Sequence, residues 1–198
     1  MKNTCICMYS FGGVCTRMFN IWLVETCGFT TNNQVDVHHG WDSMNKSNKV
    51  IYIYSDPVEA VLSFYGKHHA GGNDGVFLNK HAKNLNIQEA PPTSITKYNE
   101  DHFKLYDHYK RYTDRVSKIQ DKPTLLLNTQ YLWDYEDQLL KFLNINHKLP
   151  QLKSKRPKPW LTDSILNNLN EIYSEMREEL NCTDKFVSNN QLTDTNNC

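Results

Sequence analysis

The chain has 198 residues, which suits a single globular domain, and 22 lysines and arginines balance 22 aspartates and glutamates. A formal net charge of +0 argues against a general nucleic-acid-binding protein, because such proteins carry a strong basic excess. Hydrophobic residues make up 39% of the chain and aromatic residues 12%, enough for a packed core, and no apolar run is long enough to cross a membrane.

The cysteines and the N-terminal segment indicate a compartment. None of the six cysteines forms a CxxC pair, and none lies between Cys27 and Cys182. This spacing favours neither a disulfide framework nor a zinc site. Residues 1–10 lack the long apolar region and cleavage site of a signal peptide. We therefore expect a cytoplasmic protein.

The first predicted elements are a strand, a glycine turn and a helix. Residues 4–10 have the character of a buried strand, residues 11–17 form the turn, and residues 18–27 carry apolar side chains near helical spacing. Residues 34–39 alternate as a second strand, and residues 49–54 form a continuous apolar strand. Continuous apolar strands are typical of a parallel sheet covered on both faces.

The alternation continues after Asp56-Pro57, because proline suits the first turn of a helix. The elements predicted next are a helix from Pro57 to about residue 67, an irregular stretch over 66–97, a helix over 100–119, a strand over 123–129, a short helix over 134–145, a basic loop over 152–160 and an amphipathic helix over 161–180. The pattern predicts one α/β domain over residues 1–180, a three-layer sandwich with a central, mostly parallel sheet. Residues 181–198 form a polar, flexible tail in this prediction.

The glycine turn is the first candidate site. A strand-to-helix turn directs several backbone N–H groups at one point, and the helix dipole adds positive potential there. Thr16 supplies a hydroxyl and Arg17 a guanidinium, both suited to a phosphate. The Walker A pattern GxxxxGK[ST] is absent, which disfavours ordinary ATPase or kinase chemistry. The alternative interpretation is a tight structural turn with an exposed Arg17.

Two histidine pairs are the next candidates. His38-His39 closes the second predicted strand, where open α/β sheets place catalytic groups, and a histidine there can act as a general base. The alternative is a pair of ordinary surface or core histidines. His68-His69 repeats the pair, but no third and fourth ligand stands at a suitable spacing, so we expect no metal site.

Two further segments could bind anions. Ser63 lies in the helix that starts at Pro57, where it is either a ligand or a solvent-facing serine. Residues 153–158 contain four cations in six positions, which form an anion site if they fold against the sheet and a solvated loop if they do not.

In their order along the chain, these segments resemble the sulfotransferase family that uses 3′-phosphoadenosine 5′-phosphosulfate (PAPS). That family holds the 5′-phosphosulfate in a first strand–turn–helix whose loop reads KSGTT or, in heparan-sulfate 3-O-type enzymes, KGGTR; Gly13-Val14-Cys15-Thr16-Arg17 aligns with it. A strand that ends in the catalytic base follows, and His39 occupies a comparable place, with His38 beside it. The next strand leads to R-[DN]-P and a serine eight residues after the arginine, similar to KVIYIYSDPVEAVLSFY with Ser63.

The resemblance extends from about residue 4 to residue 180. PTLLLNTQYLWDYEDQLLKFLNI is similar to the family's strand, YEDL motif and helix, and LKSKRPKPWLTDSILNNLNEIYSEM to its late loop and closing helix. That loop covers the 3′-phosphate in the family, so the resemblance carries Lys155 and Arg156 over to the donor site. The donor-binding residues that it implies are Gly12, Gly13, Val14, Cys15, Thr16, Arg17, Ser63, Lys155 and Arg156.

The resemblance implies a P-loop-like sulfotransferase fold and a transfer reaction without a metal. A sulfuryl group would pass from PAPS to a hydroxyl or amine of a small-molecule or carbohydrate acceptor, leaving 3′,5′-adenosine bisphosphate (PAP), while His39 takes the acceptor's proton. Residues 66–122 would line the acceptor side. Their aromatic side chains could stack on an acceptor or belong to the core: Tyr98, Phe103, Tyr106 and Tyr109.

Two departures from the family motifs define the alternatives. The lysine that leads the family loop is Gly13 here, and the arginine of R-[DN]-P is Ser55. Each charged hydrogen bond contributes about 1.5–3 kcal/mol, so the two losses weaken donor binding unless other cations substitute. Arg17 could replace the first charge, and Arg156 or Lys155 the second. Otherwise the chain is a degenerate, non-catalytic protein that binds a nucleotide or a partner; a nucleotide kinase is disfavoured.

Overall fold

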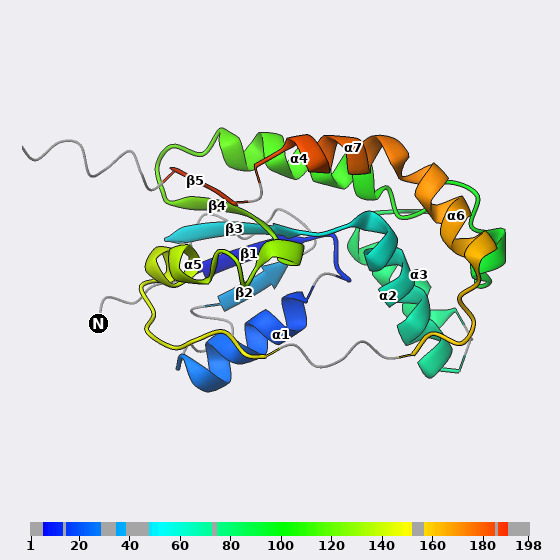
Figure 1. Ribbon diagram of the computed structural model, residues 1–198, viewed down its shortest axis with the longest axis horizontal. Helices are drawn as coiled ribbons and strands as arrows, with labels where there is room; N and C mark the ends of the chain where they lie inside the picture. Colours follow the sequence, from blue (N-terminus) through cyan, green and yellow to red (C-terminus); the bar gives the residue numbers. More distant parts are fainter. Residues whose placement is uncertain are drawn as a thin grey trace, which may run out of the picture.

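The computed structural model describes residues 6–13, 15–28, 35–38, 48–72, 75–151, 157–184 and 186–189. In this part of the chain the strands form one sheet in the order β2-β1-β3-β4-β5 (Figure 1). The strands are β1 (Ile6–Ser10), β2 (Val35–His38), β3 (Lys49–Tyr54), β4 (Thr124–Asn128) and β5 (Phe186–Ser188). The first four are parallel and β5 is antiparallel to β4, which confirms the predicted α/β class with a mostly parallel sheet.

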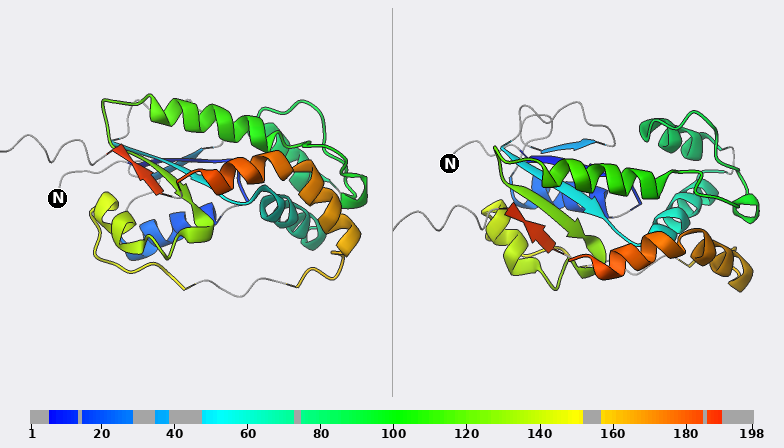
Figure 2. Two further views of the ribbon diagram at one scale, coloured as in Figure 1. Left: turned by 45° about the horizontal axis from the view of Figure 1, so that its top comes forward. Right: turned by 90° about the horizontal axis from the view of Figure 1, so that it is seen from above.

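Helices cover both faces of the sheet and one end of it. The helices are α1 (Thr16–Ile21), α2 (Pro57–Ala70), α3 (Val76–Asn84), α4 (Leu105–Ser117), α5 (Glu136–Leu143), α6 (Asp163–Ile172) and α7 (Ser174–Cys182). In Figures 1 and 2, α4 lies over one face of the sheet and α1 and α5 over the other, while α7 lies beyond the carboxyl end of β4. Helices α2, α3 and α6 lie beyond the carboxyl ends of β1 and β3.

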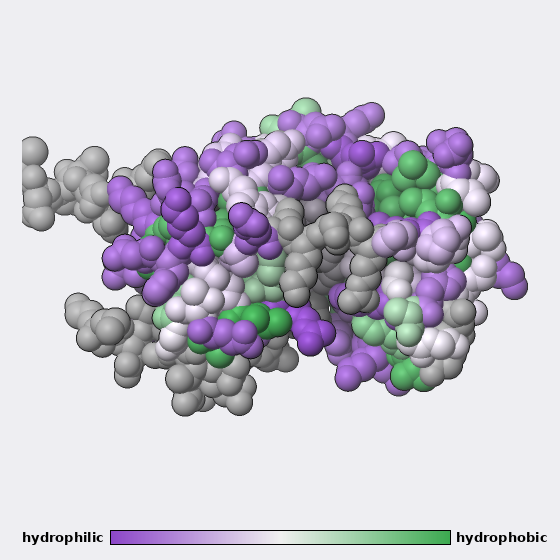
Figure 3. Space-filling view, turned by 60° about the horizontal axis from the view of Figure 1, so that its bottom comes forward, coloured by the Kyte–Doolittle hydropathy of each residue, from purple (hydrophilic) through white to green (hydrophobic). Residues whose placement is uncertain are grey.

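The sheet forms the centre of the core, as its continuous apolar strands predict. Every side chain of β1 and β4 is buried, and so are those of β3 from Val50 to Tyr54. Tyr52 stacks on His108 and Tyr112 of α4, and its hydroxyl lies 3.2 Å from His108 Nδ1, which ties α4 to the sheet. Burial raises the pKa of Tyr52 well above its ordinary value. On the face shown in Figure 3, hydrophilic side chains predominate and hydrophobic ones form small separate groups.

The stretch over 66–97 is less irregular than predicted. Helix α2 continues to Ala70, and α3 occupies residues 76–84. The buried face of α3 includes Leu78, His81 and Ala82, so a histidine takes a core position and obscures the apolar periodicity. The prediction of a loop here was wrong because the pattern counts only apolar residues.

The C-terminal region also differs from its prediction. The single helix expected over 161–180 is broken at Tyr173, which separates α6 from α7. Tyr173 is 1% exposed, and its hydroxyl donates to Asp101 Oδ1 at 2.7 Å and lies 2.6 Å from the Tyr98 hydroxyl. Residues 186–188 form β5 within the segment that we predicted as a tail. Asn189 then accepts a hydrogen bond from the Thr124 amide.

Most of the aromatic side chains considered for the acceptor side belong to the core. Tyr98, Phe103 and Tyr109 are each no more than 2% exposed. Tyr106 is half-buried, and its hydroxyl donates to the carboxylate of Glu179 on α7 at 2.7 Å. Phe103 packs against Phe64 of α2 and His81 of α3, and Tyr109 against Tyr54 of β3, so the structure supports the core interpretation. Within the described residues, no helix is both long and apolar enough to span a membrane.

Candidate functional site

The turn after β1 has a left-handed backbone held from inside. Gly12 and Gly13 have φ values of 83° and 71°, and Cys15, the residue before α1, has a φ of 57°. The buried Ser10 side chain links both ends of the turn, because its Oγ accepts from the Gly12 amide at 3.2 Å and lies 3.0 Å from Thr16 Oγ1. Thr16 is buried, whereas Cys15 and Arg17 are exposed; Val14 lies outside the described residues.

The turn packs directly on α2 through Gly13. A Cβ atom at this position would lie 2.9 Å from the Cα and the carbonyl oxygen of Ala60 and from the ring of Phe64. Only glycine fits, because the backbone of α2 occupies the place of a side chain and the φ of 71° is left-handed. The ring of His81 on α3 adds a second support, since its Nε2 donates to the Phe11 carbonyl at 3.0 Å.

The second strand-to-helix junction joins β3 to α2 and is capped by its own carboxylate. Asp56 Oδ1 accepts from the amides of Val58 at 2.8 Å and Glu59 at 3.3 Å, and Pro57 occupies the first turn. Arg177 of α7 donates through Nε to Asp56 Oδ2 at 2.8 Å. A guanidinium from a distant part of the chain therefore binds Asp56, the residue that follows Ser55.

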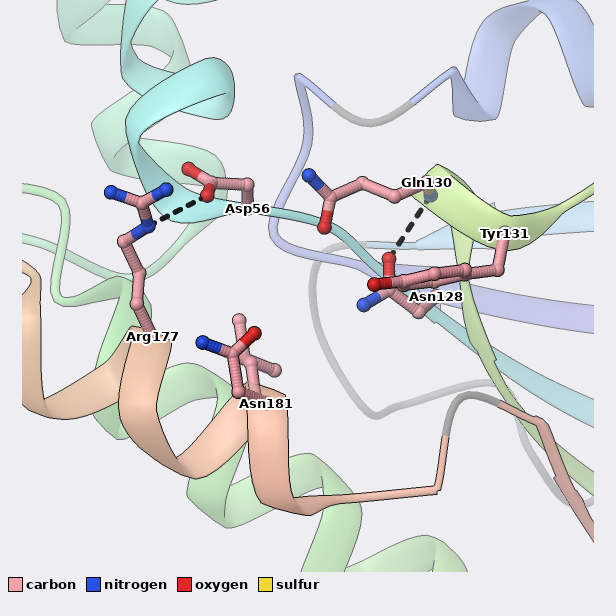
Figure 4. Close-up of a pocket in the computed structure, with 7 residues that line it drawn as sticks. Asp56, Asn128, Gln130, Tyr131, Arg177 and Asn181 are labelled. Carbon is pink, nitrogen blue, oxygen red and sulfur yellow. Dashed lines mark hydrogen bonds and ion pairs between the residues drawn. The ribbon is translucent and has the colours of Figure 1, made fainter.

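A small polar pocket opens beside this junction, at the carboxyl ends of β3 and β4 (Figure 4). Its volume is roughly 120 Å³, well below the ~300–1,000 Å³ of typical small-molecule sites. Asn128 Oδ1 accepts from the Gln130 amide at 3.0 Å, which leaves the Asn128 NH₂ group as a donor. The charges of Asp56 and Arg177 offset each other, so the pocket suits a neutral hydrogen-bonding group. The lining residues are Asp56, Asn128, Gln130, Tyr131, Arg177, Leu180 and Asn181.

Ser63 lies half-buried on the outer face of α2, and the end of the basic loop packs near it. Lys158 Nζ is 3.5 Å from Glu59 Oε2, one turn before Ser63. The Trp160 ring packs against His69 at a tilt of 37°, with ring centroids 5.0 Å apart, about two turns after Ser63. Residues 157–160 thus follow the face of α2 that carries Ser63. Lys155 and Arg156, the predicted ligands in this loop, lie outside the described residues.

Lys67 is a cation that the sequence analysis did not select. It lies one turn beyond Ser63 on α2, and its Nζ is 5.7 Å from the centre of the Phe77 ring. Burial lowers the pKa of the Lys67 ammonium, Arg17 lowers it further by repulsion, and Cys15 partly offsets both effects. Lys67 therefore lies close to the start of α1. The spacing of four residues from Ser63 was the signal that could have identified it.

The histidine predictions have different outcomes. His38 ends β2 opposite Tyr9 of β1, and His39, the predicted base, lies outside the described residues. The choice between His38 and His39 stays a prediction. His68 is 1% exposed, and its Nδ1 has no hydrogen-bond partner among the described residues. No group of three or more His, Cys, Asp or Glu side chains in the described ranges could hold a metal ion.

The turn after β1 and helix α2, which carries Ser63, therefore pack against each other at the carboxyl ends of β1 and β3. Comparison of the chain with protein-family models, curated proteins and solved structures found no match.

Proposed function

We propose that this protein binds PAPS along the turn after β1 and the outer face of α2, and transfers its sulfuryl group to a hydroxyl or amine acceptor. One observation carries the proposal: the contact of Gly13 with Ala60 and Phe64 joins the two segments that resemble the family's donor-binding motifs. Strands β1 and β3 are neighbours, and β2 lies on the other side of β1. In open parallel sheets, ligands bind beyond the carboxyl ends of strands where the connections diverge.

Each donor-site residue has a role in this proposal that follows from its chemistry. The Gly13 amide, the Thr16 hydroxyl and the Arg17 guanidinium hold the 5′-phosphate and stabilise the charge that grows on it as it leaves, while the Gly12 amide donates to Ser10 Oγ within the turn. Ser63 donates to the 3′-phosphate, assisted by Lys155 and Arg156. These contacts act mainly by positioning and by electrostatics, as in phosphoryl transfer.

The proposed transfer is a single in-line displacement. The acceptor oxygen or nitrogen forms a bond to sulfur while the bond from sulfur to the 5′-phosphate oxygen breaks, and PAP leaves with the electron pair. The acceptor's proton passes to His39 as general base. Atoms and charges balance without an oxidant, a reductant or a covalent intermediate on the protein.

A second candidate function is nucleotide binding without transfer. The contact at Gly13 favours it, because α2 fills the position from which the family's loop lysine extends. The pocket volume of roughly 120 Å³ points the same way, since it is small for a whole nucleotide. The two candidates share a donor site and differ in whether the chemistry follows binding.

Calorimetry with PAP, followed by radiolabelled sulfate transfer from PAPS to a panel of acceptors, tests both candidates. We expect Ser63→Ala to weaken PAP binding about 10- to 150-fold, the loss of one hydrogen bond to a charged group. Ser117→Ala, which changes an exposed serine on α4, is the matched control and should leave binding unchanged. Binding without transfer favours the non-catalytic candidate, and absence of PAP binding contradicts both.

A further inference from the structure

We propose that Lys67 supplies the cation that the turn after β1 lacks, and that it neutralises the phosphate group held by this turn. The inference rests on the proposed function for the identity of the ligand as a nucleotide donor. It rests on the structure for the placement of the charge. In this proposal, α2 both packs against the turn and provides the positive charge beside it.

The contact at Gly13 explains why the charge has to come from another element. A side chain at this position would collide with the backbone of α2, 2.9 Å from the Cα and the carbonyl oxygen of Ala60. These backbone atoms are fixed by the helix and cannot change conformation to make room, as the end of a flexible side chain could. No residue with a Cβ, and so no lysine, fits at Gly13 while α2 lies against the turn.

Helix geometry directs Lys67 towards the turn. Ala60 and Phe64, which contact Gly13, lie seven and three residues before Lys67, so all three share one side of α2. Each Cα–Cβ bond in a helix is tilted towards the N-terminus, and the long lysine side chain therefore extends back towards Phe64 and the turn. The Phe77 ring of α3, 5.7 Å from Nζ, borders the ammonium group.

The cation that acts on Lys67 most strongly is Arg17, at the start of α1. Arg17 and Lys67 approach from α1 and α2, and in the described part of the chain neither forms an ion pair with a carboxylate. Partial burial and the repulsion from Arg17 lower the pKa of Lys67, while Cys15 offsets part of this effect. A phosphate placed between the two cations would relieve the repulsion and raise that pKa.

Calorimetry with two probes, PAP and inorganic pyrophosphate, tests the assignment. We expect Lys67→Gln to weaken binding of both probes at least 10-fold, and Lys67→Arg to retain most of the affinity. Lys83→Gln is the matched control, because it removes one exposed lysine from α3 and should leave both affinities within about twofold. Circular dichroism of each variant confirms that it is folded.

The pH dependence of pyrophosphate binding adds a readout that a purely structural lysine would not move. Affinity should fall as Lys67 loses its proton, at a pH below the ordinary lysine value of 10.5. Lys67→Arg keeps its charge there, so its affinity should persist to higher pH. Arg17 and Cys15 are present in both proteins, so the difference between them reports Lys67 alone.

The outcomes separate this inference from the proposed function. PAP binding that is equal in the wild type and Lys67→Gln overturns the role of Lys67 and leaves the donor site in place. Pyrophosphate binding that depends on Lys67, without binding of PAP, supports the anion site and contradicts the proposed function. If the wild type binds neither probe, both proposals are wrong.

Discussion

The two strand-to-helix junctions at the carboxyl ends of β1 and β3 differ in how their helices begin. After β3, Asp56 accepts hydrogen bonds from two amides and begins an α-helix of 14 residues. After β1, the α-helix has only six residues before a π-helical turn over Trp22–Thr26, and Cys15 makes no capping hydrogen bond through its side chain. The first turn of α1 contains no acidic residue, whereas that of α2 contains Glu59.

The cations near the two junctions also differ, because only one of the junctions has a cation paired with a carboxylate. Arg177 at the β3 junction is bound to the Asp56 carboxylate, so the charge there is neutralised within the chain. Arg17 and Lys67 at the β1 junction form no ion pair among the described residues. Helix N-termini favour negative charge. One junction therefore contains its own anion, whereas the other has two cations with no carboxylate partner among the described residues.

The largest expected effect concerns the packing of the β1 junction. Gly13→Ala should lower the free energy of unfolding by about 2–4 kcal/mol, from the collision with Ala60 and from the left-handed backbone. Gly28→Ala is the matched control, because Gly28 has a φ of 75° but nothing within 4 Å of its Cβ position. It should lose only about 1–2 kcal/mol. Urea unfolding followed by circular dichroism measures both.

Equal losses for the two glycine variants would show that α2 does not press on the turn, and the comparison of the two junctions would lose its basis. The same contact predicts that Gly13→Lys fails to restore the family's loop lysine, because the new side chain displaces α2.

The next effect concerns the internal anion of the β3 junction. Asp56→Ala should cost about 1–2 kcal/mol of stability through loss of the cap. Asp56→Asn should stay within about 0.5 kcal/mol of wild type, because asparagine caps as well as aspartate and the Arg177 side chain is 42% exposed. Thr162→Ala, which removes the cap of α6, provides the scale for a cap that binds one amide. A large loss in Asp56→Asn would mean that the ion pair, and not the cap, holds this junction.

The smallest effect concerns the hydroxyl pair inside the β1 junction. Thr16→Val keeps the shape of the side chain and removes its contact with Ser10 Oγ at 3.0 Å. We expect a loss of about 1 kcal/mol in urea unfolding, since Ser10 still accepts from the Gly12 amide. Thr113→Val on α4, where the hydroxyl bonds only to helix carbonyls, should change stability by less. A loss several times larger for Thr16→Val would show that Ser10 and Thr16 define the turn.

Part of the site was visible in the sequence because local pattern determines local structure. The run of apolar residues in β1, followed by two glycines and Thr16-Arg17, predicted a turn that opens a helix, and the structure has turn conformations at Gly12, Gly13 and Cys15 before α1. Asp56-Pro57 predicted the start of α2 because a cap and a proline act within one turn. These features depend on neighbours along the chain, which the sequence records directly.

The sequence by itself determined the α/β class and the buried strands β1, β3 and β4, because hydrophobic periodicity is local. Only the tertiary structure decided which distant residues meet: Arg177 with Asp56, and Gly13 with Ala60. It also decided the break at Tyr173, where a buried hydroxyl finds Asp101 on another segment. These contacts depend on how α2 and α7 pack against the sheet edge, and packing between distant elements leaves no periodic signal in a single sequence.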